Sequence, residues 1–71
     1  MKAARSKFGK RIRELRQRKG MTQQGLAERC GFHRNRIGRI ERGQIDVALG
    51  TILTLAETLE LSVSSLFRNL A

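Results

Sequence analysis

The stretch from Gln23 to Ile40 limits what this chain can fold into more than any other part of it. Its apolar residues recur at helical spacing, and Gly31 follows Ala27 by four residues. Because glycine adopts the left-handed backbone conformation readily, Gly31 marks the end of a helix. The small side chain of Ala27 lets a second helix pack closely against the first. The stretch therefore predicts two short helices joined by a tight turn.

The second of these helices, over residues 34–42, has a solvent side rich in nitrogen donors. Guanidinium groups match the acceptors of guanine in the DNA major groove, and the asparagine amide matches adenine. A basic helix braced by a small-residue contact is what a helix-turn-helix requires. The same side chains could form a solvated face without function, but their place directly after the turn favours base reading. They are His33, Arg34, Asn35, Arg36 and Arg39.

The positive charge is concentrated in the first part of the chain. The 71 residues carry a formal net charge of +9, and the sequence pI is about 11.6. Residues 1–42 hold 14 Lys and Arg against 3 Asp and Glu, whereas residues 43–71 hold 1 against 3. This balance indicates a polyanionic partner, and nucleic acid is the most common one. The first part can therefore face phosphates while the second faces another surface, such as a second subunit.

Helical periodicity extends through the rest of the chain, and no strand signal interrupts it. Phe8, Ile12 and Leu15 predict an amphipathic helix over residues 4–19. A basic amphipathic helix can also bind an anionic membrane surface, but here the apolar stripe is narrow and lacks Trp. The sequence therefore favours a helix that packs within a globular domain.

Capping residues predict where the other helices begin. Thr22 is a good N-cap for a helix over residues 23–30, and Asp46 is the expected cap of a fourth helix. Ser62 is the expected cap of a fifth helix from residue 63 to about residue 69. These signals predict one all-α domain of five helices over residues 1–71. The apolar stripe of the fourth helix is Leu49, Ile52, Leu53, Ala56 and Leu59, with Leu55 beside it.

The last part of the chain has more apolar side chains than so short a domain needs to bury. A core of this size is marginal unless a partner chain adds buried surface. The surplus therefore predicts that residues 46–70 contribute to a homodimer interface. The alternative is that the same side chains complete the monomer core. The candidate interface residues are Ile45, Val47, Leu66, Phe67 and Leu70.

Several classes of function find no support in the sequence. Cys30 is the single cysteine and is expected to be a small buried side chain. His33 is the single histidine, without a second ligand at a useful spacing, so we expect no metal and no other cofactor. Scattered acids complete no catalytic constellation, and we expect no enzyme and no small-molecule ligand. No apolar run approaches a membrane span of ~20 residues or a signal peptide, so we expect a soluble cytoplasmic protein.

Three motifs follow one another in the middle of the chain. They are Met21-Thr22-Gln23-Gln24-Gly25-Leu26-Ala27, Cys30-Gly31-Phe32 and Ile37-Gly38-Arg39-Ile40-Glu41-Arg42-Gly43. Together they resemble the lambda-repressor-like, phage Cro/CI (Xre-type) DNA-binding domains. Residues 49–59 and 61–67 look like helices four and five of that family, so the match covers about residues 6–68. A domain of this length is most similar to the small phage repressors and to the controller proteins of restriction–modification systems. The resemblance implies a five-helix fold with its helix-turn-helix at about residues 23–42.

The resemblance also implies roles for individual side chains. Arg16 and Glu41 match a partly buried ion pair that ties the first helix to the end of the third. Gln23 matches a residue that bonds a backbone phosphate and helps to orient the recognition helix. The positions that match base-facing residues are His33, Arg34, Asn35 and Arg39. The positions expected near phosphates are Thr22, Gln23, Arg36, Arg42 and Gln44.

The chain departs from the family pattern at three places. Gly25 stands where Glu is common, and Gly38 stands where Ser or a similar residue is common. Both glycines are expected to loosen their helices. Residues 47–48 are Val-Ala where Pro-Ser is common, which leaves the geometry of the loop before the fourth helix open.

These patterns predict a sequence-specific regulator of transcription that binds double-stranded DNA. A homodimer would bind a palindromic operator with the third helix of each subunit in the major groove. One alternative is the antitoxin of a toxin–antitoxin pair, which would bind both DNA and a toxin protein. The other is a non-specific architectural protein that coats DNA. Co-purification of a second protein would favour the former, and a uniform, salt-dominated response to every DNA sequence would favour the latter.

Overall fold

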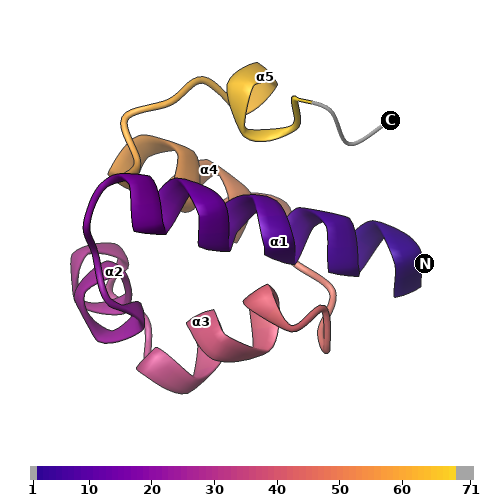
Figure 1. Ribbon diagram of the computed structural model, residues 1–71, viewed down its shortest axis with the longest axis horizontal. Helices are drawn as coiled ribbons and strands as arrows, with labels where there is room; N and C mark the ends of the chain where they lie inside the picture. Colours follow the sequence, from indigo (N-terminus) through magenta and orange to yellow (C-terminus); the bar gives the residue numbers. More distant parts are fainter. Residues whose placement is uncertain (1, 69–71) are drawn as a thin grey trace.

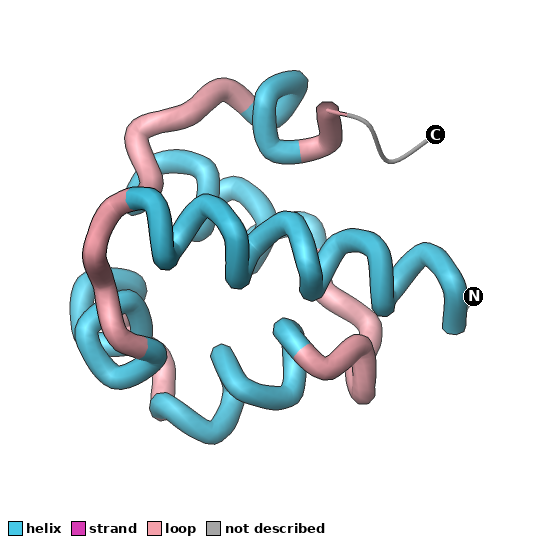
Figure 2. The backbone as a smooth tube through the Cα atoms, in the orientation of Figure 1, coloured by secondary structure: helices cyan, strands magenta, loops and turns pink. Residues whose placement is uncertain are grey.

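The computed structural model describes residues 2–68, and its chain folds into helices joined by short loops (Figures 1 and 2). No residue within this range lies in a strand. The expected all-α fold of five helices is therefore confirmed. The helices are α1 (Lys2–Arg18), α2 (Gln23–Cys30), α3 (Arg34–Glu41), α4 (Leu49–Thr58) and α5 (Val63–Leu66).

Helix α1 runs across the middle of the molecule in the view of Figure 1. Helices α2 and α3 lie below it in this view, α4 lies behind it and partly above, and α5 lies above it. The apolar stripe expected on α1, Phe8, Ile12 and Leu15, is buried. One core therefore joins all five helices. Its members are Phe8, Ile12, Leu15, Leu26, Ala27, Ile37, Ile40, Leu55, Ala56, Leu59 and Leu66.

Helix α4 buries only part of its apolar surface. Leu55 and Leu59 are fully buried, whereas Leu49 and Leu53 are 70% and 49% exposed. Both sets fit the period of a helix, so periodicity alone does not show which side meets the core. The apolar stripe expected on α4 is thus divided between the core, which holds Leu59, and the surface, which holds Leu49 and Leu53.

The expected cap of α4 is also wrong. The helix begins at Leu49, and the N-cap position is Ala48, which provides no side-chain hydrogen bond. Asp46 lies two residues too early to accept from the first turn of the helix. Its carboxylate instead lies 3.5 Å from the guanidinium of Arg5 in an exposed ion pair. The expected caps Thr22 and Ser62, in contrast, are confirmed.

Several helix boundaries differ from the expected ones by one to three residues. Helix α1 spans Lys2–Arg18 instead of residues 4–19, and α3 ends at Glu41 instead of residue 42. Helix α5 is a single turn that ends at Leu66 instead of near residue 69, which lies outside the described residues. Between residues 2 and 68, no helix is both long and apolar enough to cross a membrane.

The structure removes Leu66 from the predicted dimer interface. Its side chain is fully covered within the monomer and belongs to the core. The next residue, Phe67, stacks on Phe8 with the ring centroids 5.2 Å apart, yet 39% of it stays exposed. Leu66 therefore cannot offer a surface to a second subunit, while Phe67 can. Leu70 lies outside the described residues.

Candidate nucleic-acid interface

The turn between α2 and α3 is held by local hydrogen bonds and one close packing contact. The hydroxyl of Thr22 accepts from the backbone N–H of Gly25 at 2.9 Å and so begins α2. Gly31 ends the helix in the left-handed conformation, with φ 77°. The backbone N–H of Phe32 then donates to the carbonyl of Ala27 at 2.8 Å. Ala27 is buried beside this turn. The spacing of Ala27 and Gly31 therefore correctly predicts a close contact between α2 and α3.

Helix α3 has one apolar side and one polar side. Ile37 and Ile40 are buried in the core. His33 is the N-cap, and its Nδ1 accepts from the backbone N–H of Asn35 at 3.1 Å. This bond orients the ring and leaves Nε2 on the outside. All four candidate base-contacting residues lie on the exposed surface: His33, Arg34, Asn35 and Arg39.

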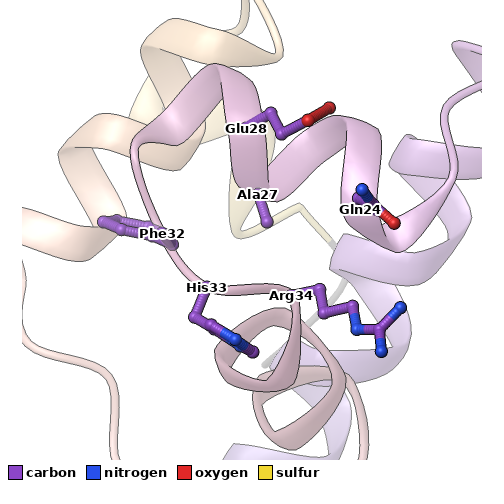
Figure 3. Close-up of a pocket in the computed structure, with 6 residues that line it drawn as sticks. All are labelled: Gln24, Ala27, Glu28, Phe32, His33 and Arg34. Carbon is purple, nitrogen blue, oxygen red and sulfur yellow. The ribbon is translucent and has the colours of Figure 1, made fainter.

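A pocket of about 340 Å³ lies between α2 and the start of α3 (Figure 3). Gln24 and Glu28 border it from α2, and His33 and Arg34 border it from the other side. The ends of these side chains are exposed, so they can meet a partner that covers the turn. The pocket is thus part of the polar surface of the helix-turn-helix.

A buried polar cluster ties α1, α2 and α3 together. Arg16 donates to both carboxylate oxygens of Glu41, from Nε at 2.6 Å and from Nη2 at 3.0 Å. The amide of Gln23 donates to the same carboxylate at 3.1 Å, and Arg16 also donates to the carbonyl of Met21 at 2.8 Å. The side chains of Arg16 and Glu41 are only 10% and 3% exposed. The ion pair that the family resemblance implies is therefore present in the structure.

Arg36 is engaged within the protein. Its guanidinium donates to the hydroxyl of Thr51 at 2.6 Å and lies 4.3 Å above the centroid of the Phe32 ring. These contacts brace α3 against α4. Arg36 itself is an exposed residue, so these contacts hold its guanidinium at the surface, and its expected place near a phosphate stays a prediction.

The other residues expected near phosphates differ in whether their side chains are already hydrogen-bonded within the protein. The hydroxyl of Thr22 caps α2, and the amide of Gln23 is bonded to Glu41. Arg42 and Gln44 are exposed at the end of α3. A residue that the sequence did not single out, Arg13 of α1, lines a cavity together with Gln23 and Arg42. Nothing in the local sequence around Arg13 distinguishes it from the other cations of α1, because its position depends on how α1 packs on α3.

Two of the candidate dimer residues, Val47 and Phe67, line an apolar pocket. Val47 is half-buried and lines a pocket of about 440 Å³ with Phe8, Ile52 and Phe67. Ile45 is half-buried against the core. The structure adds exposed apolar residues that were not among the interface candidates: Leu49, Leu53 and Val63.

No group of three His, Cys, Asp or Glu side chains comes together as a possible metal site in residues 2–68. Cys30 is half-buried, and its thiol lies 3.4 Å from the hydroxyl of Thr58. The exposed side of α3, by contrast, offers guanidinium, amide and imidazole donors. A short helix with such a surface, held across a left-handed glycine turn, defines the class of helix-turn-helix DNA-binding proteins.

Comparison with known proteins agrees with this class. A family model described as a helix-turn-helix domain matches residues 7–66. The control protein C.SmaI of Serratia marcescens is 40% identical over 55 residues, which are 78% of this chain and 66% of that protein. The chain thus spans about two thirds of the length of this relative. It belongs to the Xre-type helix-turn-helix family.

Solved structures of restriction–modification controller proteins share the fold. C.AhdI of Aeromonas hydrophila superposes with a TM-score of 0.86 and 46% identity, over 89% of this chain and 96% of that one. The C.Esp1396I tetramer in complex with its natural 35-base-pair operator superposes with a TM-score of 0.85 and 31% identity, over 94% and 88%. These relatives are control proteins and not enzymes, as we expect of this chain from its sequence.

Proposed function

We propose that this protein is a regulator of transcription that binds double-stranded operator DNA as a homodimer, with α3 of each subunit in the major groove. The observation that carries the proposal is the division of α3 into a buried side, with Ile37 and Ile40, and an exposed side of nitrogen donors. A helix of this kind fits the width of the major groove. Two-fold symmetry then calls for half-sites about one turn of DNA, ~34 Å, apart.

Two further observations support the proposal. The excess of cations lies in residues 1–42, which contain α1 and the helix-turn-helix, so that phosphate contacts would come from the same part as base contacts. Among the similar proteins, C.Esp1396I is a controller protein bound to its operator. The counterions released by phosphate contacts would make binding weaken steeply as salt rises.

Selection from random DNA tests the proposal. The purified protein is mixed with random duplexes at near-physiological salt, and the retained duplexes are sequenced. We expect enrichment of a two-fold symmetric motif with half-sites about ten base pairs apart. If duplexes are retained without any enriched motif, and if all of them are released uniformly as salt rises, the protein coats DNA without reading its sequence.

Arg34→Ala tests base reading. Arg34 is exposed at the start of α3, where a guanidinium can pair with both acceptors of guanine. Its loss should weaken binding to the enriched motif by about 1–3 kcal/mol and relax the preference at one base pair of each half-site. The measurement is a titration of labelled duplexes that carry each base at each position.

The matched control for Arg34→Ala is Arg18→Ala. Arg18 follows Gly9 by about two and a half helical turns and therefore lies on the side of α1 away from α3, beside Glu14. This change removes the same charge and should leave base preference as it is. If Arg34→Ala bound its best site as tightly and selectively as the unmodified protein, Arg34 would have no base contact.

Leu53→Lys tests the homodimer. We propose that the exposed apolar residues of the second half form the interface: Ile45, Val47, Leu49, Leu53, Val63 and Phe67. Because Leu53 is 49% exposed, lysine is accommodated in the monomer but would place an unpaired charge in an interface. We expect the sedimentation coefficient to fall from that of a dimer to that of a monomer. Gln17→Lys, an exposed change on α1, should leave the dimer intact.

A further inference from the structure

A cavity of about 280 Å³ lies where α1, the start of α2 and the end of α3 meet. Its lining carries three guanidinium groups, one carboxylate and one amide. The carboxylate of Glu41 is bonded to Arg16 and to Gln23, so the charge of Arg16 is compensated inside the protein. The other two cations, Arg13 and Arg42, are exposed, and neither pairs with an acid within residues 2–68. The cavity therefore has an excess of two positive charges.

Gly38 makes the room in which one of these cations lies. A Cβ atom at this position would be 3.0 Å from Nη1 and 3.5 Å from Nη2 of Arg42. It would also be 3.5 Å from Oε1 of Gln23. The flat guanidinium of Arg42 thus covers the backbone of α3 at the place where any other residue would carry a side chain. The fold itself does not need this glycine, because its φ is not positive and the neighbouring atoms are flexible side-chain ends rather than backbone.

The family resemblance already implies that Gln23 and Arg42 lie near phosphates. We propose that Arg13 of α1 completes with them a seat for one phosphate of the DNA backbone, and that Gly38 is a positioning residue that keeps Arg42 in this seat. The proposal rests on the proposed function and names a contact within it. Guanidinium groups match two phosphate oxygens at once, and two uncompensated guanidiniums suit a diester with a single negative charge. The Gln23 amide donates one hydrogen to Glu41 and has a second one left.

The seat would position the protein without reading sequence. Phosphate contacts set the register and orientation of a protein on the duplex, whereas base contacts provide specificity. Arg13 belongs to α1, and Arg42 is the C-cap of α3. One phosphate held by both would therefore fix α3 relative to the groove through two different helices.

Gly38→Ala should stabilise the fold and weaken DNA binding at the same time. Alanine has the higher helix propensity and displaces only the mobile end of Arg42, so the Tm should rise by about 2–6 °C. The displaced guanidinium would lose its phosphate. We therefore expect Kd to rise about five- to tenfold, equally for the most enriched duplex and for a scrambled duplex of the same length. The slope of log Kd against log salt should become shallower by about 1.

Circular dichroism and fluorescence anisotropy of fluorescein-labelled duplexes provide these measurements. Gly50→Ala is the matched control, since a Cβ at this exposed position in α4 meets nothing within 4 Å. It should leave Kd and the salt slope unchanged. Arg13→Ala should reduce the slope by about 1 without any effect on the packing of α3, whereas Arg18→Ala should not. In an Arg42→Ala background, Gly38→Ala should no longer change Kd.

Two results would overturn the seat. One is a Gly38→Ala variant with the Kd and salt slope of the unmodified protein. The other is a Gly38→Ala effect that persists in full after Arg42 has been removed. Failure of the proposed function is a different result, in which the unmodified protein enriches no motif. The seat remains testable in that case, because binding to scrambled duplexes depends on the same phosphates.

Discussion

Replacing Glu41 by alanine should lower the free energy of unfolding by about 3–5 kcal/mol, because it leaves a buried cation without its partner. The carboxylate of Glu41 accepts two hydrogen bonds from Arg16 and one from Gln23, and only 3% of its side chain is exposed. A small domain has about 5–15 kcal/mol of stability in total. The loss should therefore be visible as a large shift of the urea midpoint, measured at a fixed protein concentration because a dimer unfolds in a concentration-dependent way.

Two controls separate the loss of this pair from a general effect of removing charge. Glu14→Ala removes a carboxylate that is 52% exposed and pairs with Arg18 and with Arg11, and it should change stability by less than about 1 kcal/mol because water reaches this carboxylate. A double variant, Arg16→Met with Glu41→Leu, replaces the pair by apolar side chains and should recover much of the stability. A Glu41→Ala midpoint close to that of Glu14→Ala would show that water reaches Arg16 and compensates its charge.

The local chemistry of the turn is the part that the sequence predicts best. Gly31 and Ala27 act on their immediate neighbours, so that their spacing alone indicates the end of α2 and its contact with α3. The caps Thr22 and Ser62 act within a single turn of helix and were also predicted correctly. These features need no knowledge of the rest of the fold.

Contacts between distant residues are harder to predict. Arg16 and Glu41 are 25 residues apart and were expected as a pair only through the family resemblance. Arg36 looks like any exposed cation of α3, and only the packing of α4 brings Thr51 to its guanidinium. Leu49 and Leu53 share the period of the buried residues of α4 but lie on its outer side. In each case the deciding information is the relative placement of two helices.

The placement of α1 relative to α3 depends on Gly9. It lies on α1 where the end of α3 crosses, and it is buried there. A Cβ at this position would be 2.5 Å from the carbonyl oxygen of Glu41 and closer still to that of Ile40. Both are backbone atoms of a helix and cannot turn away as a side chain can. The absence of a side chain at position 9 therefore sets how closely α1 approaches α3.

Gly9→Ala should consequently destabilise the domain by about 2–3 kcal/mol, although alanine favours helix. The gain in helix propensity is at most about 1 kcal/mol. Overpacking against rigid neighbours has an opposite effect of about 1–3 kcal/mol and sometimes more. Because the added Cβ would meet two backbone oxygens, we expect a loss of stability at the upper end of this range. Urea unfolding beside the unmodified protein and Gly50→Ala, whose Cβ meets nothing, measures the difference.

The same variant should also impair DNA binding beyond its effect on stability. Separation of α1 from α3 moves Arg13 away from Arg42, and it strains the bonds between Arg16 and Glu41. We expect the fraction of Gly9→Ala that stays folded at low temperature to bind DNA with a shallower salt dependence. If that folded fraction bound with unchanged affinity and slope, α1 would be no more than a support for the core. The close crossing at Gly9 would then matter for folding alone, and phosphate contacts would come from α2 and α3.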